Sequence, residues 1–406
     1  MNKENSFNFP AEFWHFLSAK LFFVLGVRMI SSVVIYQTFK LANTYMVGVV
    51  GLTEFLPAVL TAMYAGHYID NNNKKKILSS AYFSYLLCGI LLAVISNSYF
   101  DLSPSTKLLF ILFAVFATGI IRSFGSPASN SMIPAIVPKD NLQKAVSLNS
   151  SAYLTSSIIG HAIGGLLIAA IGISYAYAVA ATLLFIAFII SQKIKSKPPI
   201  VGITKEPVLQ SIKHGFDFVW KTKPLLGVIT LDLFAVLFGG AVAFIPEIAE
   251  NVLHTGARGY GFLNAAMDIG ALVSVVLFLW FPMKKKQGLK MLLAVAGFGI
   301  FIIVFGLSKV YWLSFVALAC AGVCDGLSVV VRGMITQLYT PDELRGRVSS
   351  INGIFINSSN ELGQFESGFT SKLMTTIPAV IFGGVMSVLV VAATWFKFPD
   401  LKKIEY

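Results

Sequence analysis

The chain has 406 residues, of which 56% are hydrophobic and 12% are charged, whereas a soluble domain carries about 25% charged residues. This composition and a mean hydropathy of +0.76 exclude an ordinary soluble protein and indicate a polytopic membrane protein. The net charge of +12 would suit a nucleic-acid-binding protein, but the basic residues collect in the polar connections between apolar runs. We therefore expect contact with anionic lipid headgroups and no nucleic-acid partner.

Apolar runs of about 20 residues, long enough to cross a hydrocarbon core of about 30 Å, recur along nearly the whole chain. They predict an all-α integral membrane protein with twelve transmembrane helices, at residues 12–37, 44–67, 76–97, 106–128, 146–171, 174–192, 224–246, 258–281, 289–308, 310–336, 348–371 and 376–396. The first run is too long and too charged for a cleavable signal peptide, so we interpret it as a retained span.

The basic residues also predict the orientation of the chain. If both termini are cytoplasmic, the inner loops and tails hold roughly 22 Lys and Arg residues and the outer loops about five. The longest polar connection predicts a cytoplasmic linker, 193–223, between an N-terminal six-helix bundle, 1–192, and a C-terminal bundle, 224–406. Within the linker, Leu209, Ile212, Phe216, Val219 and Trp220 recur at helical spacing, which predicts an amphipathic helix in the membrane interface.

Two stretches repeat each other about half a chain length apart. MIPAIVPKDNLQKAVS begins at Met132 and MITQLYTPDELRGRVS begins at Met334. After a one-residue shift the match extends to Gly160 with Gly363 and to Gly165 with Gly368, pairing the fifth span with the eleventh. This offset predicts two pseudo-symmetric halves, an arrangement typical of secondary transporters.

The motifs between and within the spans resemble those of the major facilitator superfamily. Its loop between helices 2 and 3 reads G-x-L-A-D-R-x-G-R-[RK]-x-x-L, which Gly66, Asp70, Lys74, Lys75 and Leu78 match in spacing. Tyr68, Ile69, Asn71 and Asn73 depart from that motif. The resemblance implies that Asp70 takes part in a latch between the two bundles. The latch candidates are Gly66, Asp70, Lys74, Lys75, Arg345 and Arg347.

The fifth span carries a second resemblance. Gly160, Gly164 and Gly165 are similar to the antiporter motif G-P-x-x-G-G, with His161 in place of proline. Without the resemblance, these glycines predict close helix packing. Arg122 and Gly125 are loosely similar to the arginine and glycine of the helix 4 motif. The stretches LDLFAVLFGGAVAFIPEIA and TPDELRGRVSSINGIFINSSNELGQFESG resemble a bacterial branch of enterobactin-exporter-like and macrolide-efflux-like permeases.

Ionisable residues inside the predicted spans are the candidates for proton or substrate binding, because a buried charge costs about 2.5–3.5 kcal/mol on insertion scales. The candidates are Arg28, Glu54, Arg122, His161, Asp232, Asp325, Arg332, Glu361 and Glu366; Lys20 and Asp268 also lie in predicted spans. Arg28 and Glu54 fall at similar depth, so they form either a structural ion pair or a site where Glu54 carries the coupling proton.

The other candidates also have two interpretations. Asp232 is a proton or substrate site, or a polar packing residue. Asp325 and Arg332 share a helix face but stand about 10 Å apart along the axis, so each needs a partner elsewhere, and Glu361 or Glu366 could serve Arg332. His161 could titrate near neutral pH or only hydrogen-bond in a packed helix.

Three cysteines, Cys88, Cys320 and Cys324, lie in apolar segments and predict neither disulfides nor a zinc site. No nucleotide-binding loop, metal motif or catalytic triad is evident, so we expect no cofactor, no metal and no enzyme. The resemblance implies a monomeric, proton-coupled exporter of a small amphipathic molecule, a drug or a siderophore, working by alternating access in a bacterial inner membrane. The alternatives are an uptake symporter or a lysophospholipid-type flippase on the same fold, and then a membrane enzyme.

Overall fold

The computed structural model describes residues 9–196, 208–280, 285–341 and 344–405, with only the backbone for residues 63, 67, 70, 139, 208–212, 279, 345, 346, 349, 350, 354 and 357. The major helices are α1 Ala11–Leu41, α2 Thr44–Asn71, α3 Lys74–Ile95, α4 Pro104–Ile136, α5 Leu142–Ile171, α6 Ile173–Gln192, α7 Val208–Lys221, α8 Lys223–Gly239, α10 Gly256–Trp280, α11 Gln287–Leu307, α12 Tyr311–Leu338, α13 Arg345–Met374 and α14 Thr376–Lys397. All except α7 correspond to the twelve predicted spans.

Ten of these helices, in the described part of the chain, are long and apolar enough to cross a membrane by themselves. The other two are α8, which has only 17 residues, and α13, which has 30 residues but low hydrophobicity. Helix α13 tolerates polar residues because it packs against α2 of the other bundle and so lies away from lipid along that face.

Helix α8 is shorter than the predicted span, 224–246, because the chain breaks at Gly239 and Gly240. A Cβ atom on Gly239 would lie 2.5 Å from the Phe298 ring and 2.6 Å from Ser387 Oγ, so this position requires glycine. The chain continues as the short helix α9 (Ile245–Glu247) and a π-helical turn, η3 (Ile248–Val252). Helix α4 runs beyond its predicted end at 128, through Pro134, because membrane helices tolerate internal proline.

The two halves repeat each other in detail. Helices α5 and α13 both have 30 residues, and both end at a residue with a left-handed φ, Gly172 at 87° and Thr375 at 69°. Helices α6 and α14 follow directly after these corners. The repeat inferred from the sequence is therefore a structural repeat, and α5 and α13 are equivalent helices.

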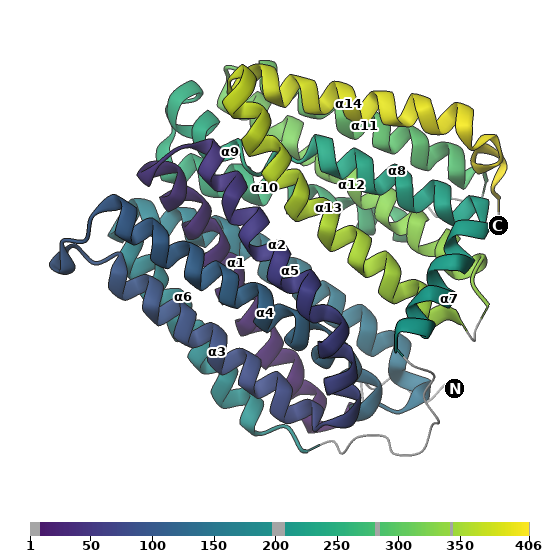
Figure 1. The fold of residues 1–406 in the computed structure, drawn as a ribbon, viewed down its shortest axis with the longest axis horizontal. Helices are drawn as coiled ribbons and strands as arrows, with labels where there is room; N and C mark the ends of the chain where they lie inside the picture. Colours follow the sequence, from purple (N-terminus) through teal and green to yellow (C-terminus); the bar gives the residue numbers. More distant parts are fainter. Residues whose placement is uncertain (1–8, 197–207, 281–284, 342–343, 406) are drawn as a thin grey trace, which may run out of the picture.

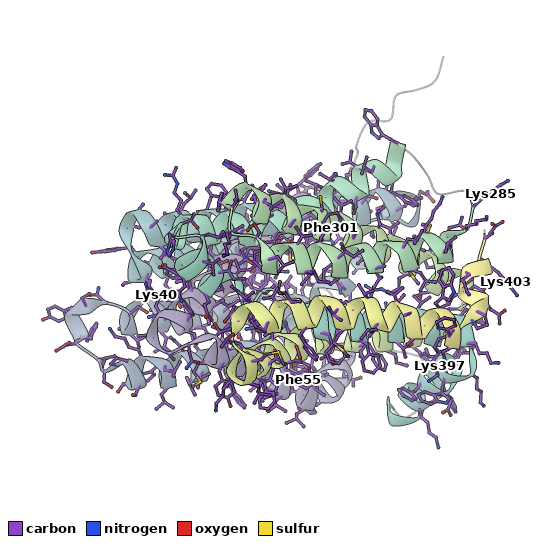
Figure 2. All side chains as sticks on the ribbon, turned by 90° about the horizontal axis from the view of Figure 1, so that it is seen from above. Lys40, Phe55, Lys285, Phe301, Lys397 and Lys403 are labelled. Atoms are coloured by element: carbon purple, nitrogen blue, oxygen red, sulfur yellow. The ribbon has the colours of Figure 1, made fainter. Side chains whose placement is uncertain are left out.

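The helices form two bundles, coloured purple to blue-green and teal to yellow in Figure 1. The start of α1, the end of α14 and α7 lie at one end of the molecule, which we call the terminal face; α9 and the α1–α2 turn lie at the opposite end, which we call the far face (Figure 1). Lys285, Lys397 and Lys403 lie at the terminal face and Lys40 at the far face (Figure 2). Helices α2 and α13 run side by side between the bundles, and α5 packs against α10.

Helix α7 lies across the terminal face, bent by 100° from α8. Its buried Val219 packs against Leu225 and Ile229 of α8 and against Val348 and Ile351 of α13. Phe216 and Trp220 stack on each other and stay exposed. Helix α7 is therefore attached to the C-terminal bundle.

Candidate functional site

Two equivalent seams join the bundles, α2 with α13 and α5 with α10. At each seam two glycines meet near the far face, Gly48 with Gly368 and Gly261 with Gly165. A Cβ atom on Gly368 would lie 2.7 Å from Gly48 Cα, and one on Gly261 would lie 2.7 Å from Gly165 Cα. The absent side chains let the backbones of the two bundles touch.

The first seam carries an ion-pair network at mid-depth. Arg122 of α4 lies 3.3 Å from Glu54 of α2 and also hydrogen-bonds Glu361 Oε1 of α13, so one guanidinium serves carboxylates of both bundles. The second oxygen of Glu361, Oε2, is buried and accepts no hydrogen bond from the described residues. Nearby, Gln364 Nε2 donates to the Val47 carbonyl at 2.8 Å. These groups hold α13 against the N-terminal bundle.

The second seam carries a polar network around His161 of α5. His161 Nδ1 lies 2.7 Å from Ser32 Oγ and 3.1 Å from Asn264 Nδ2 of α10. Its Nε2 lies 3.6 Å from the Asp268 carboxylate, to which Ser157 Oγ donates at 2.7 Å. His161 therefore joins α1, α5 and α10, and Asp268 of α10 lies at a position in this seam similar to that of Glu54 of α2 in the other.

A third set of contacts closes the far face. Thr44 donates to Glu247, Tyr36 donates to Glu250, and Lys40 Nζ lies 3.6 Å from Glu250. Both carboxylates belong to the α9–η3 segment that follows the break in α8, so the break directs them onto the α1–α2 corner of the other bundle. We call these five residues the far-face clasp.

The expected pairing of Arg28 with Glu54 is wrong. Arg28 donates to the Tyr153 hydroxyl and lies 5.4 Å from the centre of that ring, whereas Glu54 has Arg122 as its partner. The two residues share a depth, but α4 presents a guanidinium closer to Glu54. Arg28 Cβ is also the atom that a side chain at Gly160 would meet, at 2.7 Å.

The expected pairing of Arg332 with Glu361 or Glu366 is also wrong. Arg332 forms an ion pair with Asp232 of α8, within the C-terminal bundle, and both side chains are buried. Asp232 and Asp325 line one small cavity with Ser328 and Phe298. No cation of the described residues lies within ion-pair distance of Glu366, whose carboxyl group is half-buried.

The glycines of the antiporter-like motif all belong to α5, but they face two different neighbouring helices. Gly160 and Gly164 face α1, where a Cβ atom on Gly164 would lie 3.3 Å from Ser32 Cβ, and Gly165 faces α10. The motif thus sits where α5 contacts both its own bundle and the other.

The latch candidates lie at the terminal face. Lys75 Nζ donates to Gln192 Oε1 at 3.0 Å, and Lys74 begins α3. Arg347 Cβ would lie 3.1 Å from a side chain at Gly215 of α7, and Gly66 has open space around it. The side chains of Asp70 and Arg345 lie outside the described residues, so the latch remains a prediction.

Sequence patterns missed the far-face clasp and the polar partners of His161. Glu247 and Glu250 follow a predicted continuous span, and only Gly239, Gly240 and Pro246 signal the break that positions them. Ser32, Asn264 and Tyr153 match none of the sequence motifs. Among the described residues, no group of three or more His, Cys, Asp or Glu side chains could hold a metal ion.

Comparisons with known proteins agree with this architecture. A family described as transmembrane secretion effector matches residues 27–405. Enterobactin exporters of Escherichia coli O1:K1 and of Shigella boydii serotype 18 are each 28% identical over 323 residues, covering 79% of this chain and 76% of theirs.

Solved structures of transporters share the fold at low sequence identity. A D-xylose–proton symporter superposes with a TM-score of 0.77 at 15% identity, covering 97% of this chain and 99% of that one. The nucleoside transporter NupG superposes at 0.74, with 12% identity over 96% and 100% of the chains. A bacterial homologue of the human lysosomal transporter Spinster, solved inward-facing and unoccupied, superposes at 0.68, with 14% identity over 97% and 98%.

These matches confirm the twelve-helix fold and the resemblance stated from the sequence motifs, and they indicate a transporter rather than an enzyme. The chain is a multi-pass membrane protein that belongs to the transmembrane secretion effector family of the major facilitator superfamily.

Proposed function

We propose that this protein exports a small amphipathic molecule across a bacterial inner membrane, by alternating access driven by inward proton flow. The similarity to enterobactin exporters supports export and includes a siderophore or a drug among the possible substrates. The protein works as a monomer, each six-helix bundle moving against the other, with no nucleic-acid partner.

The excess of basic residues supports a cytoplasmic terminal face, with both termini inside. The far face is then periplasmic. In that orientation the glycine contacts and the far-face clasp close the outer side, and the described state is the one that takes up substrate from the cytoplasm.

The observation that carries the proton coupling is the sharing of Arg122 between Glu54 and Glu361. Two carboxylates and one guanidinium leave one negative charge in excess, and Glu361 Oε2 is buried without a donor among the described residues. A buried carboxylate oxygen without a donor is costly as an anion, and a proton lowers that cost. One proton therefore belongs to the Glu54–Glu361 pair while the far face is closed.

Rocking of the bundles changes this arrangement. Arg122 and Glu54 belong to one bundle and move together, whereas Glu361 belongs to the other. Opening of the far face takes Glu361 away from Arg122 and leaves Arg122 with Glu54 alone. The proton affinity of the pair therefore differs between the two states, which is the requirement for coupling.

The experiment uses proteoliposomes with an imposed pH gradient and a pH-sensitive dye inside. Catecholate siderophores, lipophilic dyes and lysophospholipids are tested in turn as substrates. Glu361→Gln and Glu54→Gln should abolish substrate-driven proton movement while preserving substrate exchange at equal pH, because exchange needs no net proton transfer. Glu366→Gln is the matched control, since it removes a carboxyl group from the same helix without touching Arg122.

Unchanged proton movement in both Glu361→Gln and Glu54→Gln would refute this coupling site. Substrate movement in the same direction as protons would favour the uptake symporter over the exporter. Transport of lysophospholipids alone, independent of the pH gradient, would favour the flippase.

A further inference from the structure

A cavity of about 350 Å³ opens at the terminal face of the C-terminal bundle, outside both seams. It lies between the start of α8 and the end of α14, and its lining includes Lys223, Pro224, Lys397, Phe398 and Asp400. Small-molecule sites in proteins commonly measure about 300–1,000 Å³, so the cavity has room for a headgroup-sized ligand.

The residues at the base of this cavity pack tightly against the helices of the C-terminal bundle. After α14 the chain turns back as the 3₁₀ helix η5 (Pro399–Lys403), whose Leu401 is 1% exposed. A Cβ atom on Gly227 would lie 2.7 Å from Leu401 Cδ1, and the Leu401 carbonyl lies directly against Gly288 of α11. The Lys286 backbone N–H donates to Glu405 Oε1 at 3.2 Å and holds the C-terminal residues in place.

The cavity has an excess of positive charge. Lys223 and Lys397 both line it and are exposed, and neither forms an ion pair with a described residue. The one carboxylate in the lining, Asp400, lies 3.7 Å from Lys403 and so has its own cation. An anionic group in the cavity would meet two lysine ammonium groups without displacing an existing partner.

An exposed apolar stripe leads from the cavity along α14. Phe396, beside Lys397, is 81% exposed, and Leu389 and Val385 lie about two and three helical turns further along the same face. Because α14 spans the membrane and ends at Lys397, the cavity lies at headgroup level and the stripe lies at the level of the acyl chains.

We propose that this cavity binds the phosphate of an acidic phospholipid, with an acyl chain along Phe396, Leu389 and Val385. Basic pockets between transmembrane helices at this level suit acidic lipid headgroups. The site lies outside both seams and does not depend on what the protein transports.

Native mass spectrometry of the full-length protein in detergent tests the site. Phosphatidylglycerol and phosphatidylcholine with identical acyl chains are added separately, and the retained lipid is counted. Wild type should retain one phosphatidylglycerol and no phosphatidylcholine at equal concentration. Lys223→Gln with Lys397→Gln should weaken phosphatidylglycerol binding about tenfold or more, since the two substitutions remove both cationic hydrogen-bond donors of the lining.

Lys285→Gln with Lys290→Gln is the control, because it removes the same charge from exposed residues of the same face outside the cavity lining. Equal loss in both double variants would mean diffuse attraction and overturn the site, as would full retention in the cavity variant. Inorganic phosphate and deacylated glycerophosphoglycerol should compete at least about a hundredfold more weakly than the lipid. Equal competition by either would identify a soluble phosphate ligand and overturn the lipid assignment.

Discussion

The glycine contact between α2 and α13 gives a prediction about which state the protein occupies. In Gly368→Ala the new Cβ atom lies 2.7 Å from Gly48 Cα, 2.9 Å from Gly48 N and 3.0 Å from the Thr44 carbonyl. All three are backbone atoms, so only movement of the helices can relieve the overlap. Overpacking of this kind costs about 1–3 kcal/mol.

That cost applies only while the far face is closed, because opening separates α2 from α13. Gly368→Ala should therefore shift the equilibrium toward the far-open state by about 5- to 150-fold. Alanine also raises helix propensity by about 1 kcal/mol, but this gain is the same in both states and cancels. Gly165→Ala at the equivalent seam should shift the equilibrium in the same direction.

Double electron–electron resonance can measure the shift. Spin labels replace Tyr99 and Trp312, which are 87% and 70% exposed at the far face of different bundles. The three native cysteines are first changed to serine. A longer inter-label distance should gain population in Gly368→Ala.

Gly353→Ala is the matched control, since Gly353 lies on the same helix with nothing within 4 Å of the added atom. The reasoning fails if Gly368→Ala leaves the distance distribution of the parent unchanged, or if Gly353→Ala shifts it equally.

Three further predictions concern charged residues at other depths. Asp232→Asn should lower the free energy of unfolding by about 3–5 kcal/mol, because it leaves Arg332 buried without an anion; a thermal-unfolding midpoint equal to that of wild type would contradict this. Glu250→Gln, which removes the anion beside Lys40, should raise the far-open population only severalfold, since exposed ion pairs contribute about 0–1 kcal/mol, and the same spin labels would measure it. A shift larger than that of Gly368→Ala would mean that the clasp, not the glycine contact, holds the far face closed. Asp70→Asn should lower transport by weakening closure of the terminal face in the far-open state, with unchanged topology in a cysteine-accessibility assay, and full transport activity would exclude the latch.

The failed pairing of Arg28 with Glu54 shows where sequence reasoning reaches its limit. Counting residues along each span gives depth, because every helix advances about 1.5 Å per residue. It does not give the direction in which a side chain points, which depends on how each helix is rotated against its neighbours. Arg28 and Glu54 lie at similar depth, but the rotation of their helices points Glu54 toward Arg122 and Arg28 toward Tyr153.

The internal repeat was the most informative pattern in the sequence. Gly165 and Gly368 coincide in the repeat, and in the structure each contacts a glycine of the opposite bundle. Sequence comparison of the halves identified these two positions. Their partners, Gly48 and Gly261, lie outside the repeated stretch and required the packing of α2 and α10 to be found.

The sequence alone determined the class of the protein, the existence and order of its spans and its two-fold repeat. Those features follow from local composition and from the spacing of apolar runs. In lipid, an apolar run of about 20 residues forms a helix because its backbone N–H and C=O groups must hydrogen-bond within the segment. Only the tertiary structure decided the break after α8, the partners of the buried charges and the cavity between α8 and α14. Each of these depends on contacts between residues far apart in the chain, which hydropathy and spacing do not encode.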